Sequence, residues 1–296
     1  MNHPDAQALA RAGDTRRQAF LRVARRYVRR RLTRELDGVW VSGLAEARAA
    51  LAQRPLIFVA NHVAWWDALL LLPLDAALGG TGWAVVDSRS LRSLPFFGWV
   101  GALPLDRSSP QRSRECLQAC ADLLDRPGRG VWVFPQGRQR PAHLRPLDLK
   151  TGLGVMHARS PVDLVAVSIN YVFLERSRPA AVVRFSAPIA GASLAGASPV
   201  GASPDGASPV GGGPDGASPV GGGTDGGDGE TGAALLAAME SALLDGLDAI
   251  DVAVMAATDG RRARTHPQDP LPGFVPLVAP ARWPLPRGFG KRPRRG

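Results

Sequence analysis

The stretch from Pro55 to Asp67 constrains the fold more than any other part of the chain. Leu56 to Ala60 is a short apolar run, which is typical of a strand buried on both faces of a sheet. A Leu-rich segment from Val63 to Leu72 follows and predicts a helix. The pattern therefore predicts a buried strand, a turn that holds Asn61 and His62, and a helix.

The spacing of His62 and Asp67 limits how the two side chains can meet. Five residues on one continuous helix span about 500° at roughly 100° per residue, so the two would not share a face. They can meet only if His62 precedes the helix and Asp67 lies in its first turns. The carboxylate would then fix the tautomer of a general base. The alternative is a surface histidine beside an aspartate that favours the helix dipole.

Strands and helices alternate along residues 37–190. Strands are predicted at 40–41, 56–60, 83–86, 103–105, 131–134, 164–170 and 181–185, and helices at 46–52, 66–78 and 110–125. This alternation predicts an α/β fold with a mixed, mostly parallel sheet flanked by helices. Because ligands of open α/β sheets bind at the carboxyl ends of strands, we expect His62, Arg107 and Gln136 at one rim.

Basic residues gather at the two ends of the chain. Residues 11–34 hold ten Arg and one Asp, and residues 261–296 hold nine basic residues and one Asp, within a total net charge of +10. Such ends suit an anionic partner, either a membrane surface or nucleic acid. No nucleic-acid-binding motif accompanies the charge, so we expect no nucleic-acid partner.

Residues 1–36 are predicted to form a basic amphipathic N-terminal helix, with its helical part at 16–35. Apolar residues recur every three or four positions, and Arg fills most of the others: Phe20, Leu21, Ala24, Tyr27, Val28 and Leu32. This helix either lies in a membrane interface or packs on the main domain with a solvated arginine face. No apolar run is long enough to predict a membrane-spanning helix.

The remaining segments differ in kind from the α/β domain at 37–190. Residues 191–230 repeat units such as Gly-Ala-Ser-Pro-Val and predict a flexible, disordered insert. Residues 231–260 predict a helix, at 232–256, that packs on the domain. Residues 261–296 predict an extended, basic tail rich in Pro and Arg. Cys116 and Cys120 are interpreted as buried apolar residues rather than a disulfide or metal pair.

Four motifs, in order, resemble those of the glycerolipid acyltransferases, the 1-acylglycerol-3-phosphate acyltransferase family. They are Asn61-His62-x4-Asp67, Gly101 to Asp106-Arg107, Phe134-Pro135-Gln136-Gly137, and a strand opened by Pro161. The resemblance covers roughly residues 38–188. It implies a glycerol-3-phosphate acyltransferase-like fold and acyl transfer from acyl-CoA or acyl carrier protein to a lysophospholipid such as 1-acylglycerol-3-phosphate. It implies no metal and no cofactor besides the acyl donor.

The resemblance also implies roles for individual residues. His62 would be the general base, oriented by Asp67. The substrate-binding residues would be Gly101, Arg107, Phe134, Pro135, Gln136, Gly137, Arg138 and Arg140. The third motif departs from the family, because Gln136 replaces Glu and Arg138-Gln139-Arg140 replaces Thr-Arg-Ser. The identity of the molecule that accepts the acyl group therefore stays open.

Alternatives remain for several of these side chains. Arg107 could pair with Asp106 or another acid, and Arg138 and Arg140 could be solvated loop residues. Trp65 and Trp66 could line a substrate channel or pack in the core. His143 and His157 are interpreted as structural, and Lys150 as a weak candidate for holding an anion.

Three functions fit the sequence. The first is a phospholipid acyltransferase, peripheral on the cytoplasmic face of a membrane with anionic lipid. The second is the same chemistry on a sugar or glycolipid hydroxyl, and the third is a catalytically silent membrane-binding relative. A silent protein would have no need of His62 and Asp67, which favours an enzyme.

Overall fold

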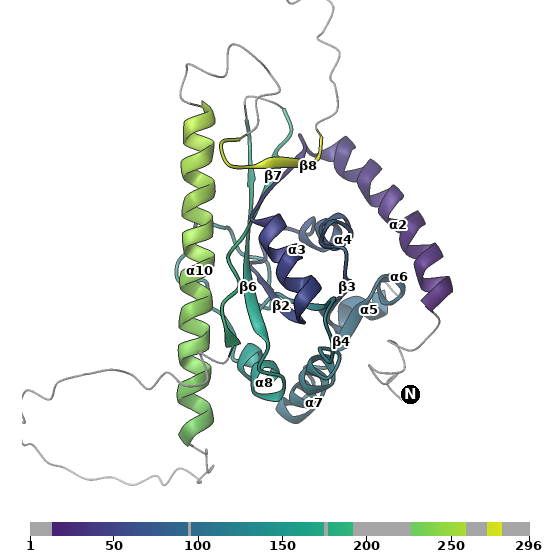
Figure 1. Cartoon of the computed structure of the whole chain (residues 1–296), viewed down its shortest axis with the longest axis vertical. Helices are drawn as coiled ribbons and strands as arrows, with labels where there is room; N and C mark the ends of the chain where they lie inside the picture. The colour runs from purple at the N-terminus through teal and green to yellow at the C-terminus, as the bar shows by residue number, and fades with distance from the viewer. Residues whose placement is uncertain (1–13, 94–95, 175–176, 192–225, 259–270, 280–296) are drawn as a thin grey trace, which may run out of the picture.

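An eight-stranded sheet forms the centre of the molecule (Figure 1). The computed structural model describes residues 14–93, 96–174, 177–191, 226–258 and 271–279. The strand order is β4-β3-β5-β2-β6-β7-β1-β8. The strands are β1 (Val39–Ser42), β2 (Leu56–Ala60), β3 (Thr81–Asp87), β4 (Ala102–Leu105), β5 (Arg129–Val133), β6 (Asp163–Val172), β7 (Ala180–Phe185) and β8 (Val275–Val278). Antiparallel pairs are β6 with β7 and β1 with β8, so the predicted mixed, mostly parallel sheet is confirmed.

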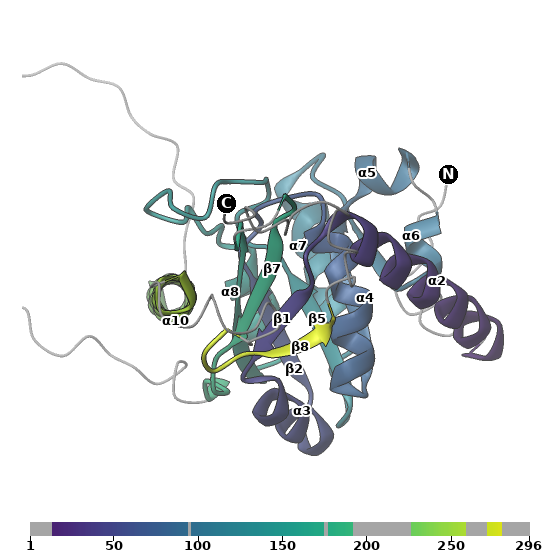
Figure 2. The same cartoon turned by 90° about the horizontal axis from the view of Figure 1, so that it is seen from above.

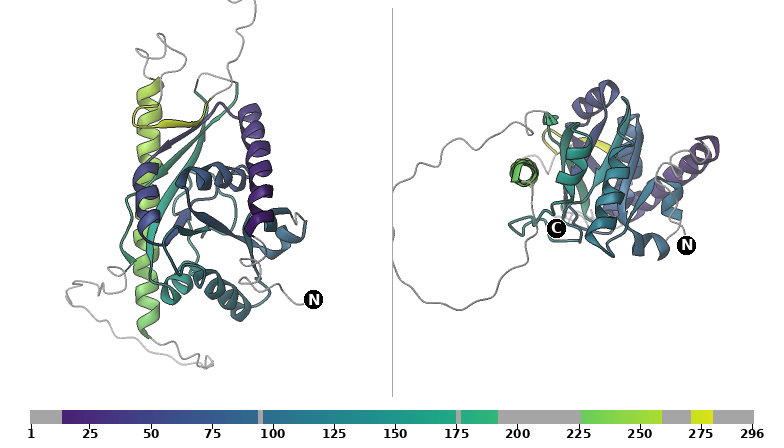
Figure 3. Two further views of the ribbon diagram at one scale, coloured as in Figure 1. Left: turned by 45° about the vertical axis from the view of Figure 1, so that its right-hand side comes forward. Right: turned by 90° about the horizontal axis from the view of Figure 1, so that it is seen from below.

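Helices cover both faces of this sheet (Figure 2). The described helices are α2 (Asp14–Glu35), α3 (Leu44–Gln53), α4 (Asp67–Leu78), α5 (Ser88–Ser93), α6 (Phe96–Trp99), α7 (Pro110–Ala121), α8 (Gly152–Arg159) and α10 (Gly226–Thr258). α3 and α4 pack on one face, with α2 outside α4, whereas α7, α8 and α10 pack on the other. Figure 3 shows α10 and α2 on opposite sides of the sheet.

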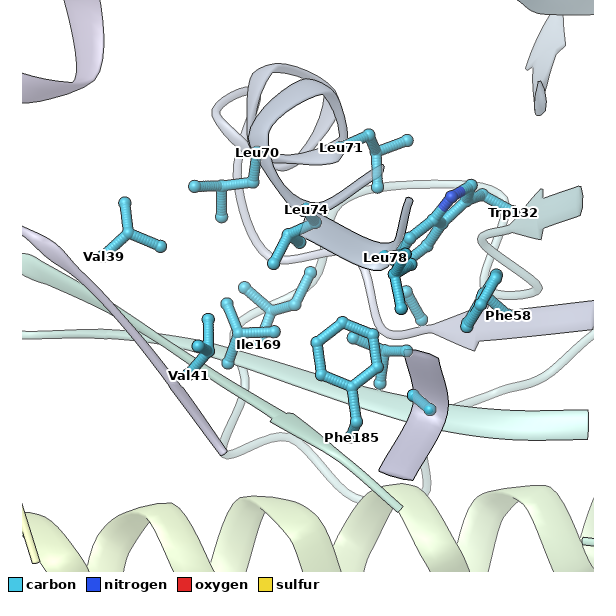
Figure 4. Packing of buried hydrophobic residues seen from close by; sticks show 14 of the residues in the cluster. Val39, Val41, Phe58, Leu70, Leu71, Leu74, Leu78, Trp132, Ile169 and Phe185 are labelled. Carbon is cyan, nitrogen blue, oxygen red and sulfur yellow. The ribbon is translucent and has the colours of Figure 1, made fainter. Parts of the chain in front are cut away.

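β2 lies inside the sheet, between β5 and β6, and every one of its side chains is apolar and buried. Its neighbours β5 and β6 both run parallel to it. Phe58 stacks on Trp132 of β5 at 4.5 Å between ring centroids, and Leu70 and Leu74 of α4 pack above the same face (Figure 4). Burying one such side chain contributes about 1.5–3 kcal/mol. This packing fixes the end of β2, where His62 begins the turn.

The apolar stripe of α2 is divided between two environments. Leu21, Val28 and Leu32 are buried, the last two in the same core as α4. Tyr27 of the stripe is 61% exposed, and Val23, an apolar residue that the predicted stripe did not include, is 68% exposed beside it. Of the two alternatives left open by the sequence, packing on the domain therefore describes the buried part of the stripe.

Several boundaries differ from the sequence-based expectations. α8 and β8 were not predicted, α7 ends at Ala121 rather than at 125, and α10 begins at Gly226, inside the expected insert. β8 adds an antiparallel strand to β1, although we expected a tail there. Residues 1–13, the insert at 192–225, and the tail at 261–270 and 280–296 lie outside the described residues.

Gly246 lets α10 approach the sheet closely. A Cβ at this position would lie 2.1 Å from Ser168 Oγ of β6. Gly246→Ala should therefore lower the free energy of unfolding by about 1–3 kcal/mol, the usual cost of overpacking. Gly232→Ala on the same helix is the matched control, because its Cβ would meet nothing within 4 Å. Urea unfolding should separate the two variants, and equal responses would contradict this packing.

Candidate active site

The turn after β2 brings His62 and Asp67 together. His62 lies between the strand and α4, and Asp67 is the first residue of that helix. His62 Nδ1 lies 2.7 Å from Asp67 Oδ2. The contact that the spacing of five residues predicted is therefore present.

Asp67 is fully buried, at 0% exposure, and its carboxylate accepts several hydrogen bonds. The backbone N–H groups of Val63 and Ala64 donate to Oδ2 at 2.6 and 2.9 Å. The Tyr171 hydroxyl donates to Oδ1 at 2.7 Å. Burial, and then the negative charge of Asp67, raise the pKa of Tyr171, so its hydroxyl stays protonated and remains a donor.

These contacts set the tautomer of a neutral His62. An ionised carboxylate only accepts hydrogen bonds, so Nδ1 must carry the proton that faces Asp67. Nε2 then keeps a free lone pair. A histidine in this state can accept a proton at Nε2, and the charge that develops on its ring faces a carboxylate.

His62 lines a cavity of about 430 Å³ beside α4 and β3. Much of its wall is apolar, from Leu71 and Leu72 of α4, Val85 and Val86 of β3, and Phe97 and Val100. Phe134 also lines the cavity, and its ring lies 4.8 Å from that of His62. The candidate base therefore stands at the wall of an apolar space.

The backbone on both sides of His62 is held by buried amides. Asn61 accepts from Ile169 N–H at 2.7 Å and donates to Ile169 C=O at 2.9 Å. Gln136 Oε1 accepts from His62 N–H at 2.6 Å, and Arg140 N–H donates to His62 C=O at 2.7 Å. The turn is thereby tied to β6 and to the loop after β5.

The predicted substrate-binding residues fall into two groups. Five line the cavity: Gly101, Arg107, Phe134, Gly137 and Arg138. Pro135, Gln136 and Arg140 are not among its lining residues. Gln136 is 3% exposed. Its side-chain oxygen accepts from His62 N–H, and its side-chain nitrogen donates to Leu147 C=O. Its side chain thus contacts the His62 turn, where we had expected it to contact substrate.

Arg107 pairs with a carboxylate, though not with its neighbour Asp106. Its Nε lies 3.7 Å from Asp87 Oδ2, while Asp106 pairs with Arg112. Its guanidinium also approaches Gly137, where a Cβ would lie 2.7 Å from Arg107 Nη2. Arg107 is half-exposed at the cavity wall, so it can still meet an anionic group there.

Besides Arg107, three basic side chains surround the carboxylate of Asp148. Arg138, Arg140 and Lys150 approach its carboxylate at 3.4, 3.5 and 2.8 Å. The hydrogen bond from Lys150 is the largest cause that lowers the pKa of Asp148. Arg138 is exposed, as expected of a solvated loop residue, whereas Arg140 is largely buried. Three cations around one carboxylate leave the cluster positively charged.

The other candidates lie away from the cavity. The rings of Trp65 and Trp66 are tilted by 32° with their centroids 4.1 Å apart, and Arg31 Cζ of α2 lies 5.7 Å from the Trp65 centroid. Neither tryptophan lines the cavity. His143 is exposed. His157 is buried, which lowers its pKa.

Both cysteines are free. Cys120 is buried, and desolvation is the main cause that raises the pKa of its thiol to about 12. An inert buried thiol is what the sequence predicted for this position.

Tyr171 and Asn61 were missed as contributors to the site. Asn61 precedes His62, and polar residues that end a buried strand are a usable signal. Tyr171 is the last residue but one of β6, which lies parallel to β2 with Val167 opposite Ala60. The signal for Tyr171 was a polar aromatic residue directly after the strand predicted at 164–170, but using this signal required knowing which strands are neighbours in the sheet.

The part of the chain that forms the candidate site is similar in sequence to known proteins. Residues 39–170 match the Acyltransferase family model. This segment belongs to the acyltransferase family. It contains His62, Asp67, the whole third motif and most of β6. We refer to residues 39–170 as the acyltransferase segment; α2 and α10 lie outside it.

Three relatives illustrate the similarity. The 1-acyl-sn-glycerol-3-phosphate acyltransferase of Saccharomyces cerevisiae is 30% identical over 125 residues, 40% of this chain and 40% of that protein. The chloroplastic 1-acyl-sn-glycerol-3-phosphate acyltransferase BAT2 of Brassica napus is 28% identical over 39% of this chain and 33% of its own length. The lyso-ornithine lipid O-acyltransferase of Pseudomonas aeruginosa is 35% identical over 29% of this chain and 31% of its own length.

The matched region thus spans 40% or less of the length of these relatives. Within the residues that the structure describes, no helix has the length and hydropathy needed to cross a membrane.

Proposed function

We propose that the chain transfers a fatty acyl group from an acyl thioester, acyl-CoA or acyl carrier protein, to a hydroxyl of a lysophospholipid. The observation that carries this proposal is the contact of His62 Nδ1 with buried Asp67, with the same histidine lining an apolar cavity. Membership of residues 39–170 in the acyltransferase family supports it.

The proposed chemistry needs a base because an alcohol is a poor nucleophile near neutral pH. His62 Nε2 takes the hydroxyl proton as the oxygen attacks the thioester carbonyl. Asp67 stabilises the imidazolium that forms. The new C–O bond replaces the C–S bond, and the proton on Nε2 passes to the departing thiolate. No covalent acyl-enzyme is required.

The cavity beside His62 suits the acyl chain of the donor. Leu71, Leu72, Val85 and Phe97 offer an apolar wall. Each buried CH₂ group of a chain contributes about 0.8 kcal/mol of binding free energy. A chain held there would place its thioester carbonyl near the histidine that lines the same space.

The acceptor is less constrained than the donor. Arg107 and the positive cluster around Asp148 favour a phosphate-bearing acceptor, because guanidinium groups bind phosphate well. However, the Gln136 side chain is already hydrogen-bonded to His62 N–H and Leu147 C=O, so it is not available to an acceptor. One relative is also named for a lyso-ornithine lipid. A phosphate-free lysolipid is therefore the second candidate, in place of the sugar or glycolipid weighed from sequence.

A turnover assay with the full chain tests the proposal. Purified protein is given acyl-CoA or acyl carrier protein together with 1-acylglycerol-3-phosphate, other lysophospholipids, lyso-ornithine lipid or a glycolipid. Thiol release and the mass of the product are recorded, with His62→Ala as control. Acylated 1-acylglycerol-3-phosphate is the expected product. The proposal is wrong if no acceptor is acylated, or if His62→Ala forms product at the wild-type rate.

We further propose that α2 holds the protein on an anionic membrane surface. Arg22, Arg26 and Arg30 are exposed beside Val23 and Tyr27. Trp99 is 64% exposed, and its ring centroid lies 5.1 Å from that of Phe20. It lies two residues after Phe97, which lines the cavity. Basic residues near such a surface contribute about 1 kcal/mol each, and exposed aromatic residues suit the interface. This surface would bring lipid close to the cavity.

The vesicle prediction follows from the exposed apolar side chains of α2, Val23 and Tyr27. Wild-type protein should sediment with anionic vesicles at low salt and much less with neutral ones. Val23→Ser with Tyr27→Ser should weaken sedimentation several-fold at unchanged charge. Val252→Ser with Met255→Ser on α10 is the matched control, because those residues are equally exposed on the other side of the sheet. Equal effects of the two pairs, or no binding of the wild type, would contradict the proposal.

A further inference from the structure

α10 contacts the candidate site although it lies outside the acyltransferase segment. Its Glu240 points at the loop after β5, where Glu240 Oε1 accepts a hydrogen bond from Leu147 N–H at 2.5 Å. The Leu147 side chain is 1% exposed and packs in the same core as Met239 and Leu243 of α10. α10 therefore holds this residue by its backbone and by its side chain.

Leu147 is in turn bonded to the residue that holds His62. Its carbonyl accepts from Gln136 Nε2 at 3.0 Å and from an Arg140 guanidinium N–H at 3.1 Å. Gln136 Oε1 then accepts from His62 N–H at 2.6 Å. A continuous series of hydrogen bonds joins α10 to the backbone of the candidate base.

The amide of Gln136 is chemically suited to this series. It must accept from His62 N–H and donate to Leu147 C=O at the same time. A carboxylate could do the first but not the second, because it has no proton to donate. The presence of Gln in place of the family's Glu therefore fits a chain in which Leu147 C=O faces position 136.

A second contact from α10 reaches the other side of the turn. Ser168 Oγ donates to Leu243 C=O at 2.8 Å. The next residue of β6, Ile169, is bonded through both its N–H and its C=O to Asn61. Since Asn61 and His62 are neighbours, α10 supports the turn from β6 as well as from Leu147.

We propose that Glu240 is a positioning residue for the reaction, which holds His62 in place through Leu147 and Gln136. This inference rests on the proposed function. Glu240 touches neither His62 nor the cavity. Its contribution is the position of the His62 backbone, and a displacement of about 1 Å at a reacting group can cost up to about 10²-fold in rate.

A matched pair of substitutions separates the hydrogen bond from the packing. Glu240→Gln keeps an acceptor for Leu147 N–H, whereas Glu240→Met keeps the approximate size and helix propensity without that acceptor. Asp245→Ala, at an exposed position of the same helix, controls for the loss of one acidic charge from α10.

Hydrogen exchange gives a readout that does not need activity. In Glu240→Met, the His62 amide should exchange about 10-fold faster, as expected for one weakened hydrogen bond. A peptide from β7, residues 180–185, should keep its protection and so exclude global loosening. Glu240→Gln and Asp245→Ala should match the wild type.

Kinetics give the second readout. In Glu240→Met, kcat should fall about 10-fold or more, with KM for the thioester within about 2-fold, because the acyl cavity is not touched. Glu240→Gln should restore kcat. Equal losses in the Met and Gln variants, wild-type exchange at His62 in the Met variant, or protection lost equally in β7 would each overturn the inference. If the wild type transfers no acyl group but the exchange pattern holds, the acyltransferase proposal fails and the link from α10 to His62 stands.

Discussion

Acyl transfer should fall by about 10²–10⁴-fold in His62→Ala, because general-base catalysis typically contributes that much. The variant should stay folded, since Asp67 keeps hydrogen bonds from Val63, Ala64 and Tyr171 when the imidazole is removed. Steady-state thiol release measures the loss, and circular dichroism checks the fold. KM for the thioester should change little, because the apolar wall of the cavity remains.

His143→Ala is the matched control for this prediction, because His143 is an exposed histidine that does not line the cavity. It should retain wild-type turnover. A folded His62→Ala variant with turnover within a few-fold of the wild type would show that another group takes the proton, and the mechanism proposed here would be wrong.

The contact of His62 with Asp67 could be predicted because it is local. A spacing of five residues across a strand end and a helix start leaves few ways for the two side chains to meet. Tyr171 could not be predicted in the same way. It lies 104 residues beyond Asp67, and its place depends on the pairing of β6 with β2, which no local pattern encodes.

Gln136 shows a different limit of motif-based prediction. The motif located the correct loop, whose neighbours Phe134 and Gly137 do line the cavity. It could not show which way each side chain points. Gln136 turns into the protein because two backbone groups, His62 N–H and Leu147 C=O, need partners there. Leu147 is itself held by α10, far along the chain, so the environment of position 136 depends on long-range packing.

The amphipathic stripe of α2 illustrates a third limit. Periodicity predicted the helix, because apolar residues spaced three and four apart share a face. It could not separate a protein core from a lipid interface, since both bury apolar side chains. In the fold, Val28 and Leu32 of the stripe pack in the core that contains α4, while Tyr27 of the stripe and nearby Val23 remain exposed. This exposed pair is available to meet a membrane, whereas the buried pair is not.

Asp67→Asn is expected to lower kcat by about 10²–10⁴-fold while the fold is kept. The asparagine Oδ1 can replace the oxygen that accepts from His62 Nδ1–H and from the Val63 and Ala64 N–H groups. Its amide nitrogen then faces the Tyr171 hydroxyl, which can rotate and accept. The geometry of the site is thus nearly retained, but the negative charge that stabilises the imidazolium is lost.

Tyr171→Phe separates that charge from its hydrogen bonds. This variant removes one donor to Asp67 and leaves the carboxylate ionised, so kcat should fall by about 10-fold at most. The larger loss in Asp67→Asn should appear in kcat, because the charge matters only once His62 has taken the proton; KM for the thioester should stay close to that of the wild type. Turnover of Asp67→Asn near the wild-type rate, or equal losses in the two variants, would mean that Asp67 only holds the turn. A large loss in Asp67→Asn alone would assign its effect to the charge that it places against the ring of His62.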